Sequence, residues 1–69
     1  MADIDHDLDL VRKAYDAKFE AHVALLISVL VLADEPDEIE SAERRFLTGA
    51  AKIRKARDRA LELLKTIPV

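Results

Sequence analysis

Apolar residues recur every three or four positions through the first half of the chain, which is the spacing of one face of an α-helix. The stripe includes one histidine and consists of Leu8, Val11, Tyr15, Phe19, His22, Leu26, Val29 and Ala33. It predicts a helix from about residue 5 to residue 33, with Asp5 or Asp7 as the N-cap. At 1.5 Å per residue, such a helix is roughly 40 Å long.

The segment DEPDE, residues 34–38, ends this helix. Pro36 disfavours the α conformation at the residue before it, yet proline fits the first turn of a following helix. Asp34 or Glu35 is then the N-cap of a second helix, from about residue 36 to residue 66. Residues 1–69 are therefore predicted to form one all-α domain, a two-helix antiparallel hairpin with its turn at residues 34–36.

Small side chains recur every seven residues in both predicted helices. If the chain folds back near residue 35, each small residue of the first helix faces one of the second. The prediction is a helix–helix seam, in which two backbones approach closely, made of Ala14, Ala21, Ser28, Ala42, Gly49 and Ala56. The alternative is that alanine is scattered along the chain because it is the best helix former.

Residues 23–33, here called the belt, carry no charge and a single polar side chain, Ser28. Their large apolar side chains point to all sides of the helix, and a helix of that kind is normally surrounded by other elements. If four of them stayed in water, about 6–12 kcal/mol of burial would be lost, at 1.5–3 kcal/mol each. That is comparable to the whole stability of an ordinary domain.

Other helices are therefore expected to cover the belt. A second copy is the simplest cover, because closed two-fold dimers are the commonest assemblies, and the result would be a four-helix bundle. A different protein or a membrane surface remains an alternative cover, although no apolar run is long enough for a membrane span. The predicted dimer interface consists of Tyr15, Phe19, His22, Leu26, Ile27, Leu30, Leu47, Leu61 and Leu64.

Candidate chemistry is sparse. With one glycine and no cysteine, the chain lacks a glycine-rich phosphate loop, disulfides and thiolate metal sites. Asp3, His6 and Asp9 share i, i+3 spacing, which suits metal ligands but equally suits capping and solvation of a helix start. His22 lies in the apolar stripe, where an interface histidine bonded to a carboxylate, a carbonyl or its symmetry mate competes with a ligand or switch role. No catalytic residue, metal or cofactor is predicted, and the chain is not expected to be an enzyme.

The chain is 36% charged with a net charge of −3, and most of its basic residues lie in the second half. The predicted partner-binding basic face consists of Arg45, Lys52, Arg54, Lys55, Arg57 and Arg59. Runs of this kind are usually solvated faces with i, i+4 pairs, and no aromatic residue lies among residues 52–59 to stack on bases.

These patterns favour a cytoplasmic, non-enzymatic protein–protein interaction module that acts as a homodimer and binds a protein partner. Such a chain would be a small regulator, adaptor or inhibitor. The alternative is a small nucleic-acid-binding regulator that uses the basic face, although the short run and the acidic balance of the chain argue against nucleic acid.

Overall fold

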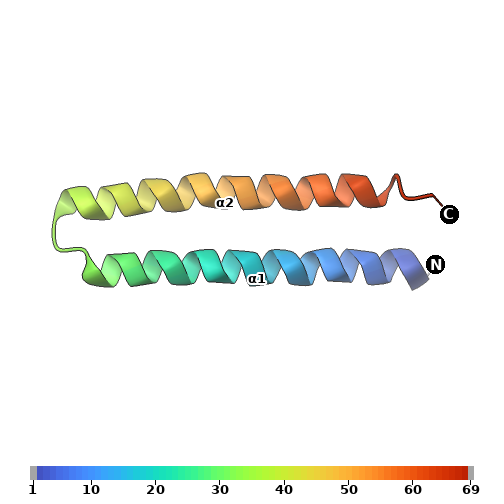
Figure 1. Cartoon of the computed structure of the whole chain (residues 1–69), viewed down its shortest axis with the longest axis horizontal. Coiled ribbons are helices and arrows are strands. Elements are labelled where there is room, and N and C mark those ends of the chain that lie inside the picture. The colour runs from blue at the N-terminus through green and yellow to red at the C-terminus, as the bar shows by residue number, and fades with distance from the viewer. Residues whose placement is uncertain (1, 69) are drawn as a thin grey trace.

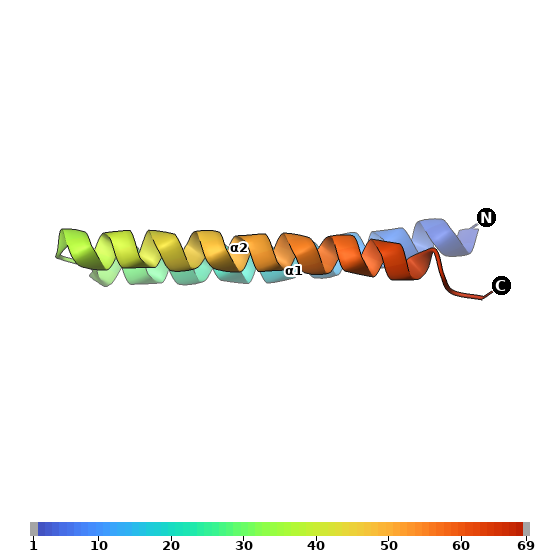
Figure 2. The ribbon, with the colours of Figure 1, turned by 90° about the horizontal axis from the view of Figure 1, so that it is seen from above.

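The computed structural model describes residues 2–68, with side chains from residue 4 onward. Two α-helices, α1 (Ala2–Leu32) and α2 (Pro36–Leu64), run antiparallel and lie side by side (Figures 1 and 2). The resulting rod measures 54 × 15 × 10 Å between Cα atoms, and both termini lie at the end opposite the turn. The predicted all-α helical hairpin is confirmed.

The helix ends differ from the predicted ones by a few residues. Helix α1 begins at Ala2, so Asp5 and Asp7 lie inside the helix and the prediction that one of them is its N-cap is wrong. Both carboxylates still lie in the first two turns, near the positive end of the helix dipole, so acidic residues suit this end without capping it. Helix α2 ends at Leu64 and is followed by a tight turn. There the Thr66 hydroxyl donates a hydrogen bond of 2.8 Å to the Leu63 carbonyl.

The turn between the helices depends on Pro36. Glu35 is the N-cap of α2 and has an extended backbone, with φ −98° and ψ 144°, as expected for the residue before a proline. Its carbonyl accepts hydrogen bonds from the N–H groups of Glu38 and Ile39, at 3.0 and 3.2 Å. The Glu38 carboxylate in turn accepts a hydrogen bond of 3.4 Å from the Asp34 N–H, so the first turn of α2 also holds the connection.

Aromatic side chains fill the middle of the contact between α1 and α2. Phe19 packs edge-on against Phe46, with ring centroids 6.3 Å apart, and the His22 ring stacks on Phe46 at 4.9 Å. His22 Nε2 also donates a hydrogen bond of 2.8 Å to the Phe46 carbonyl. His22 is therefore an interface histidine whose polar atom is satisfied by a backbone carbonyl, which is one of the roles predicted for it.

Gly49 makes room for the His22 ring. A Cβ atom at position 49 would overlap the imidazole and lie only 2.5 Å from Nε2. Glycine inside a helix costs about 1 kcal/mol relative to alanine. The close approach of His22 explains why the helix carries glycine at this position.

The predicted seam of small residues is wrong for α1. Ala14, Ala21 and Ser28 are exposed, as is Ala56 of α2. Ala42 and Gly49 of α2 lie against α1, where Ala42 is 6% exposed and Gly49 is half-buried. Ala14 and Ala56 line a hollow between the helices without being buried. The physical reason is that α1 approaches through its larger side chains, so large residues of one helix pack over small residues of the other.

We expect Gly49→Ala to lower the free energy of unfolding. Overpacking against His22 costs about 1–3 kcal/mol, and the gain in helix propensity offsets at most about 1 kcal/mol of it. Urea denaturation followed by circular dichroism, at one protein concentration, measures the change.

The matched background is His22→Ala, in which the added methyl group has space. There Gly49→Ala should instead stabilise the protein by up to about 1 kcal/mol. Equal destabilisation in both backgrounds would show that the imidazole is not what excludes a side chain at position 49.

Candidate functional site

The most prominent surface feature of this hairpin is its exposed apolar side chains. Among the described residues only Ala42 and Ala50 are buried, at 6% and 8% exposure. Large apolar side chains on both helices and in the segment after α2 remain exposed to water, namely Ile4, Leu8, Leu10, Leu25, Ile27, Val29, Val31, Leu32, Ile39, Leu47, Leu63 and Ile67. The hairpin thus has an interface between its helices and almost no interior.

This exposure is greatest in the belt. Leu32 and Val31 are 79% and 76% exposed, and Leu25 and Ile27 are 61% and 56% exposed. Successive residues of a helix point 100° apart, so these four side chains face several directions. Helix α2 covers only one side of α1 and leaves all four more than half exposed. Contiguous apolar surface of this kind usually marks an interaction site.

The structure places much of the predicted dimer interface between the two helices of one chain. Tyr15, Phe19 and His22 all contact or face side chains of α2. Ile27 and Leu47 are 56% and 67% exposed. The remaining members are half-buried, namely Leu26, Leu30, Leu61 and Leu64. A role of these residues in a dimer stays a prediction, and Ile27 and Leu47 are the two most available for it.

Two members of the predicted basic face, the exposed Arg54 and the half-buried Arg57, have aromatic partners on α1. The Arg57 guanidinium lies over the Tyr15 ring, 4.7 Å from its centroid, and Arg57 also forms an ion pair of 3.1 Å with Asp58. The Arg54 guanidinium lies 5.9 Å from the centroid of Phe19. Both contacts join α2 to α1. Sequence reasoning missed them because the aromatic partners are far away along the chain.

The other four residues of that face are exposed, namely Arg45, Lys52, Lys55 and Arg59. Arg45 donates a hydrogen bond of 3.2 Å to the Ser41 hydroxyl, one turn earlier on α2. Ion pairs at i, i+4 spacing occur elsewhere, between Lys13 and Asp9 and between Arg44 and Glu40. Such exposed pairs contribute little to stability.

One side of the hairpin carries a shallow groove between α1 and α2, here called the groove face. Its two borders are residues spaced by seven, which lie on one side of each helix. The α1 border is Lys18, Leu25 and Leu32, and the α2 border is Lys52, Arg45 and Glu38.

The two ends of the groove face differ in character. Toward the termini, a hollow of about 350 Å³ has an apolar floor that includes Val11, Ile53 and Ala56, and Lys18 and Lys52 stand at its borders. Neither lysine forms an ion pair within the part of the chain that the structure describes.

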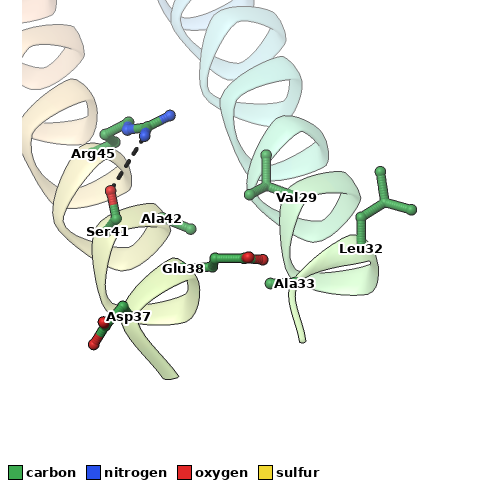
Figure 3. Close-up of a pocket in the computed structure, with 8 residues that line it drawn as sticks. All are labelled: Val29, Leu32, Ala33, Asp37, Glu38, Ser41, Ala42 and Arg45. Carbon is green, nitrogen blue, oxygen red and sulfur yellow. Dashed lines mark hydrogen bonds between the residues drawn. The ribbon is translucent and has the colours of Figure 1, made fainter. Parts of the chain in front are cut away.

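Near the turn, the corresponding hollow of about 440 Å³ is lined by Val29, Leu32, Asp37 and Glu38, among others (Figure 3). Figure 3 shows the Glu38 side chain reaching from α2 toward Ala33 while Leu32 points outward.

The described residues also bear on a metal site and on a membrane-spanning segment. Among the described side chains, no group of three or more His, Asp or Glu could hold a metal ion. The Asp3 side chain lies outside those described, so the metal alternative with His6 and Asp9 stays untested. Neither helix, over residues 2–68, is long and apolar enough to cross a membrane.

Comparisons with protein families, with curated proteins and with solved structures find no match to this chain. The exposed belt, the groove face and the distribution of charge are the features of the chain that bear on its function.

We expect Arg57→Ala to lower the free energy of unfolding by about 1 kcal/mol, because it removes the cation–π contact with Tyr15 and the packing of the arginine stem. Thermal or urea unfolding measures the loss. Lys55→Ala, an exposed change in the same segment, should stay within about 0.5 kcal/mol of wild type.

The same substitution in a Tyr15→Leu background isolates the contact. The cost of Arg57→Ala should shrink there, because the ring is gone. If Arg57→Ala lowered the free energy of unfolding equally in both backgrounds, the effect would come from α2 itself and not from the contact with Tyr15.

Proposed function

We propose that this chain is a non-enzymatic helical interaction module that folds and acts as a homodimer and that binds a protein partner through its charged surface. The observation that carries the proposal is the imbalance of burial. Two alanines are buried, whereas belt side chains as large as Leu32 and Val31 are more than three-quarters exposed. A hairpin in this state gains little from the hydrophobic effect until another surface covers it.

The size of the missing burial supports association. Full burial of a leucine, isoleucine or valine side chain contributes about 1.5–3 kcal/mol, and small single domains are stable by only about 5–15 kcal/mol. Leu25, Ile27, Val31 and Leu32 all remain to be covered. Covering even part of this surface would supply much of the stability that a chain of this length lacks.

A second copy of the same chain can supply the covering surface, because it carries the same apolar side chains. Homo-oligomers with two-fold symmetry are the commonest assemblies, and two hairpins together make a four-helix bundle. Burying the belt in such a bundle leaves charged outer faces in water. The outward-facing cations Lys55 and Arg59 are then available to an acidic protein surface, which fits a small regulator, adaptor or inhibitor.

We propose the cytoplasm as its compartment, because a chain without cysteine has no need of an oxidising environment.

Sedimentation equilibrium tests the homodimer. At micromolar concentration the mass should be twice that of the 7.8 kDa chain. The melting temperature should rise with protein concentration, because folding and association are coupled. A fully folded monomer across the micromolar range would contradict the proposal.

Nucleic-acid binding is the competing function, and the contacts of Arg54 and Arg57 with aromatic rings leave fewer free cations for it. We expect no binding to labelled duplex DNA, single-stranded DNA or RNA by fluorescence anisotropy near physiological salt, where nonspecific binders commonly reach about 10⁻⁴ to 10⁻⁶ M. Micromolar, salt-sensitive binding that is lost in a Lys52/Lys55/Arg59 triple alanine would replace the interaction module with a nucleic-acid-binding regulator.

A further inference from the structure

The groove face carries opposite charges at its two ends. Lys18 and Lys52 border the apolar hollow nearer the termini, whereas Asp37 and Glu38 line the hollow at the turn. The turn end also presents Leu32, the most exposed of the large apolar side chains, with 79% of its surface in water. An exposed leucine beside carboxylates matches an apolar hollow beside ammonium groups.

We infer that the groove face is the homodimer surface, and that the second copy lies on it antiparallel and offset, so that the turn end of each copy covers the basic hollow of the other. This inference rests on the proposed homodimer and adds its surface, direction and register.

The spacing of the borders sets the register. Leu25 is seven residues from both Lys18 and Leu32, and Arg45 is seven residues from both Glu38 and Lys52. A two-fold axis that crosses the hairpin at the level of Leu25 and Arg45 therefore exchanges the two ends. It brings Lys52 of one copy opposite Glu38 of the other, and Leu32 opposite Lys18.

The same axis brings the two Leu25 side chains together at the centre of the interface. Leu25 is 61% exposed in the single chain, so this contact buries a substantial apolar surface. Arg45 also approaches its own copy there, so this arrangement contains one pair of like charges beside its axis. Leu25, Val29 and Leu32 of the belt thus lie in the interface, while the acidic first turns of α1 extend beyond it. Ile27 and Val31 lie on other sides of α1 and stay outside this surface.

Two other arrangements bring like charges together. A parallel dimer places the turns of both copies side by side, with Asp37 and Glu38 of one copy close to those of the other. An antiparallel dimer with complete overlap has its axis near Lys18 and Lys52, so four lysines meet at its centre. Like charges that face each other across an interface cost several kcal/mol. The offset arrangement contains one such pair, Arg45 with its own copy, and otherwise places lysines opposite carboxylates.

Charge reversal tests the pairing. The dimer constant is measured by sedimentation equilibrium for wild type, for Lys18→Glu/Lys52→Glu and for Asp37→Lys/Glu38→Lys, with circular dichroism to monitor helix content. The salt concentration is about 0.1 M, at which charges more than about 10 Å apart are largely screened. Each double variant should dimerise at least about tenfold more weakly than wild type, because two-fold symmetry repeats each repulsion. An equimolar mixture of the two variants should form a heterodimer that recovers most of the lost affinity.

The matched control is Lys13→Glu/Lys55→Glu. It makes the same change in charge with one substitution on each helix, and neither residue lines the groove face. The control should dimerise within about threefold of wild type, because its charges are exposed and screened. If the control weakens the dimer as much as Lys18→Glu/Lys52→Glu does, net charge is the cause and the proposed surface is wrong.

Label distances test the register without relying on charge. Because the chain has no cysteine, Ala17→Cys provides a single exposed attachment point for a spin label, and Ala17 does not line the groove face. Along the rod, the two labels of an offset dimer lie about 24 Å apart at 1.5 Å per residue, against about 3 Å with complete overlap and still less in a parallel dimer. Oxidation of Leu25→Cys should also give a disulfide-linked dimer.

The outcomes separate the inference from the proposed homodimer. A short distance between labels at position 17, in a protein that is still dimeric, would overturn the offset register and leave the homodimer standing. A wild-type protein that is monomeric by sedimentation would overturn both.

Discussion

Two helices can share only one line of contact, and this geometric limit governs the whole molecule. Each helix presents one stripe to its neighbour, and the rest of its surface must face water or another chain. In this hairpin the shared line is occupied by Phe19, His22 and Phe46 above Gly49. A third or fourth helix is the only way to add an interior, and this is the structural reason for the proposed association.

The contact of His22 with Gly49 and Phe46 fixes how the two helices are aligned. The imidazole needs a gap in the facing helix, and the gap exists only where a residue has no Cβ. Its hydrogen bond to the Phe46 carbonyl gives the contact a direction that apolar packing lacks. A polar group between helices that finds its partner in only one alignment is an established way of specifying register, and the half-buried His22 is such a group.

The sequence predicts the hairpin because Pro36 and the three-to-four spacing of apolar residues are local signals. It also predicts that the belt lacks cover, because one neighbouring helix reaches one side only. The sequence does not predict the seam correctly, since alanine is favoured both by close packing and by helix propensity. Ala21 is exposed, and helix propensity is sufficient to explain it. The sequence also does not predict the contact of Arg57, whose partner Tyr15 is 42 positions away along the chain. Pairings between distant side chains depend on the alignment of the helices, which periodicity leaves open by a residue or more.

The turn has a topological consequence. It contains no glycine, and no described residue has a positive φ. The extended backbone of Glu35 therefore follows from Pro36, and the hydrogen bond from the Asp34 N–H to Glu38 is a second contact that holds the connection. Without that proline, residues 2–64 have the composition of one unbroken helix about 95 Å long. Two such rods side by side and antiparallel would restore the contacts between α1 and α2, with each half drawn from a different molecule. One pyrrolidine ring therefore separates a closed hairpin from domain exchange.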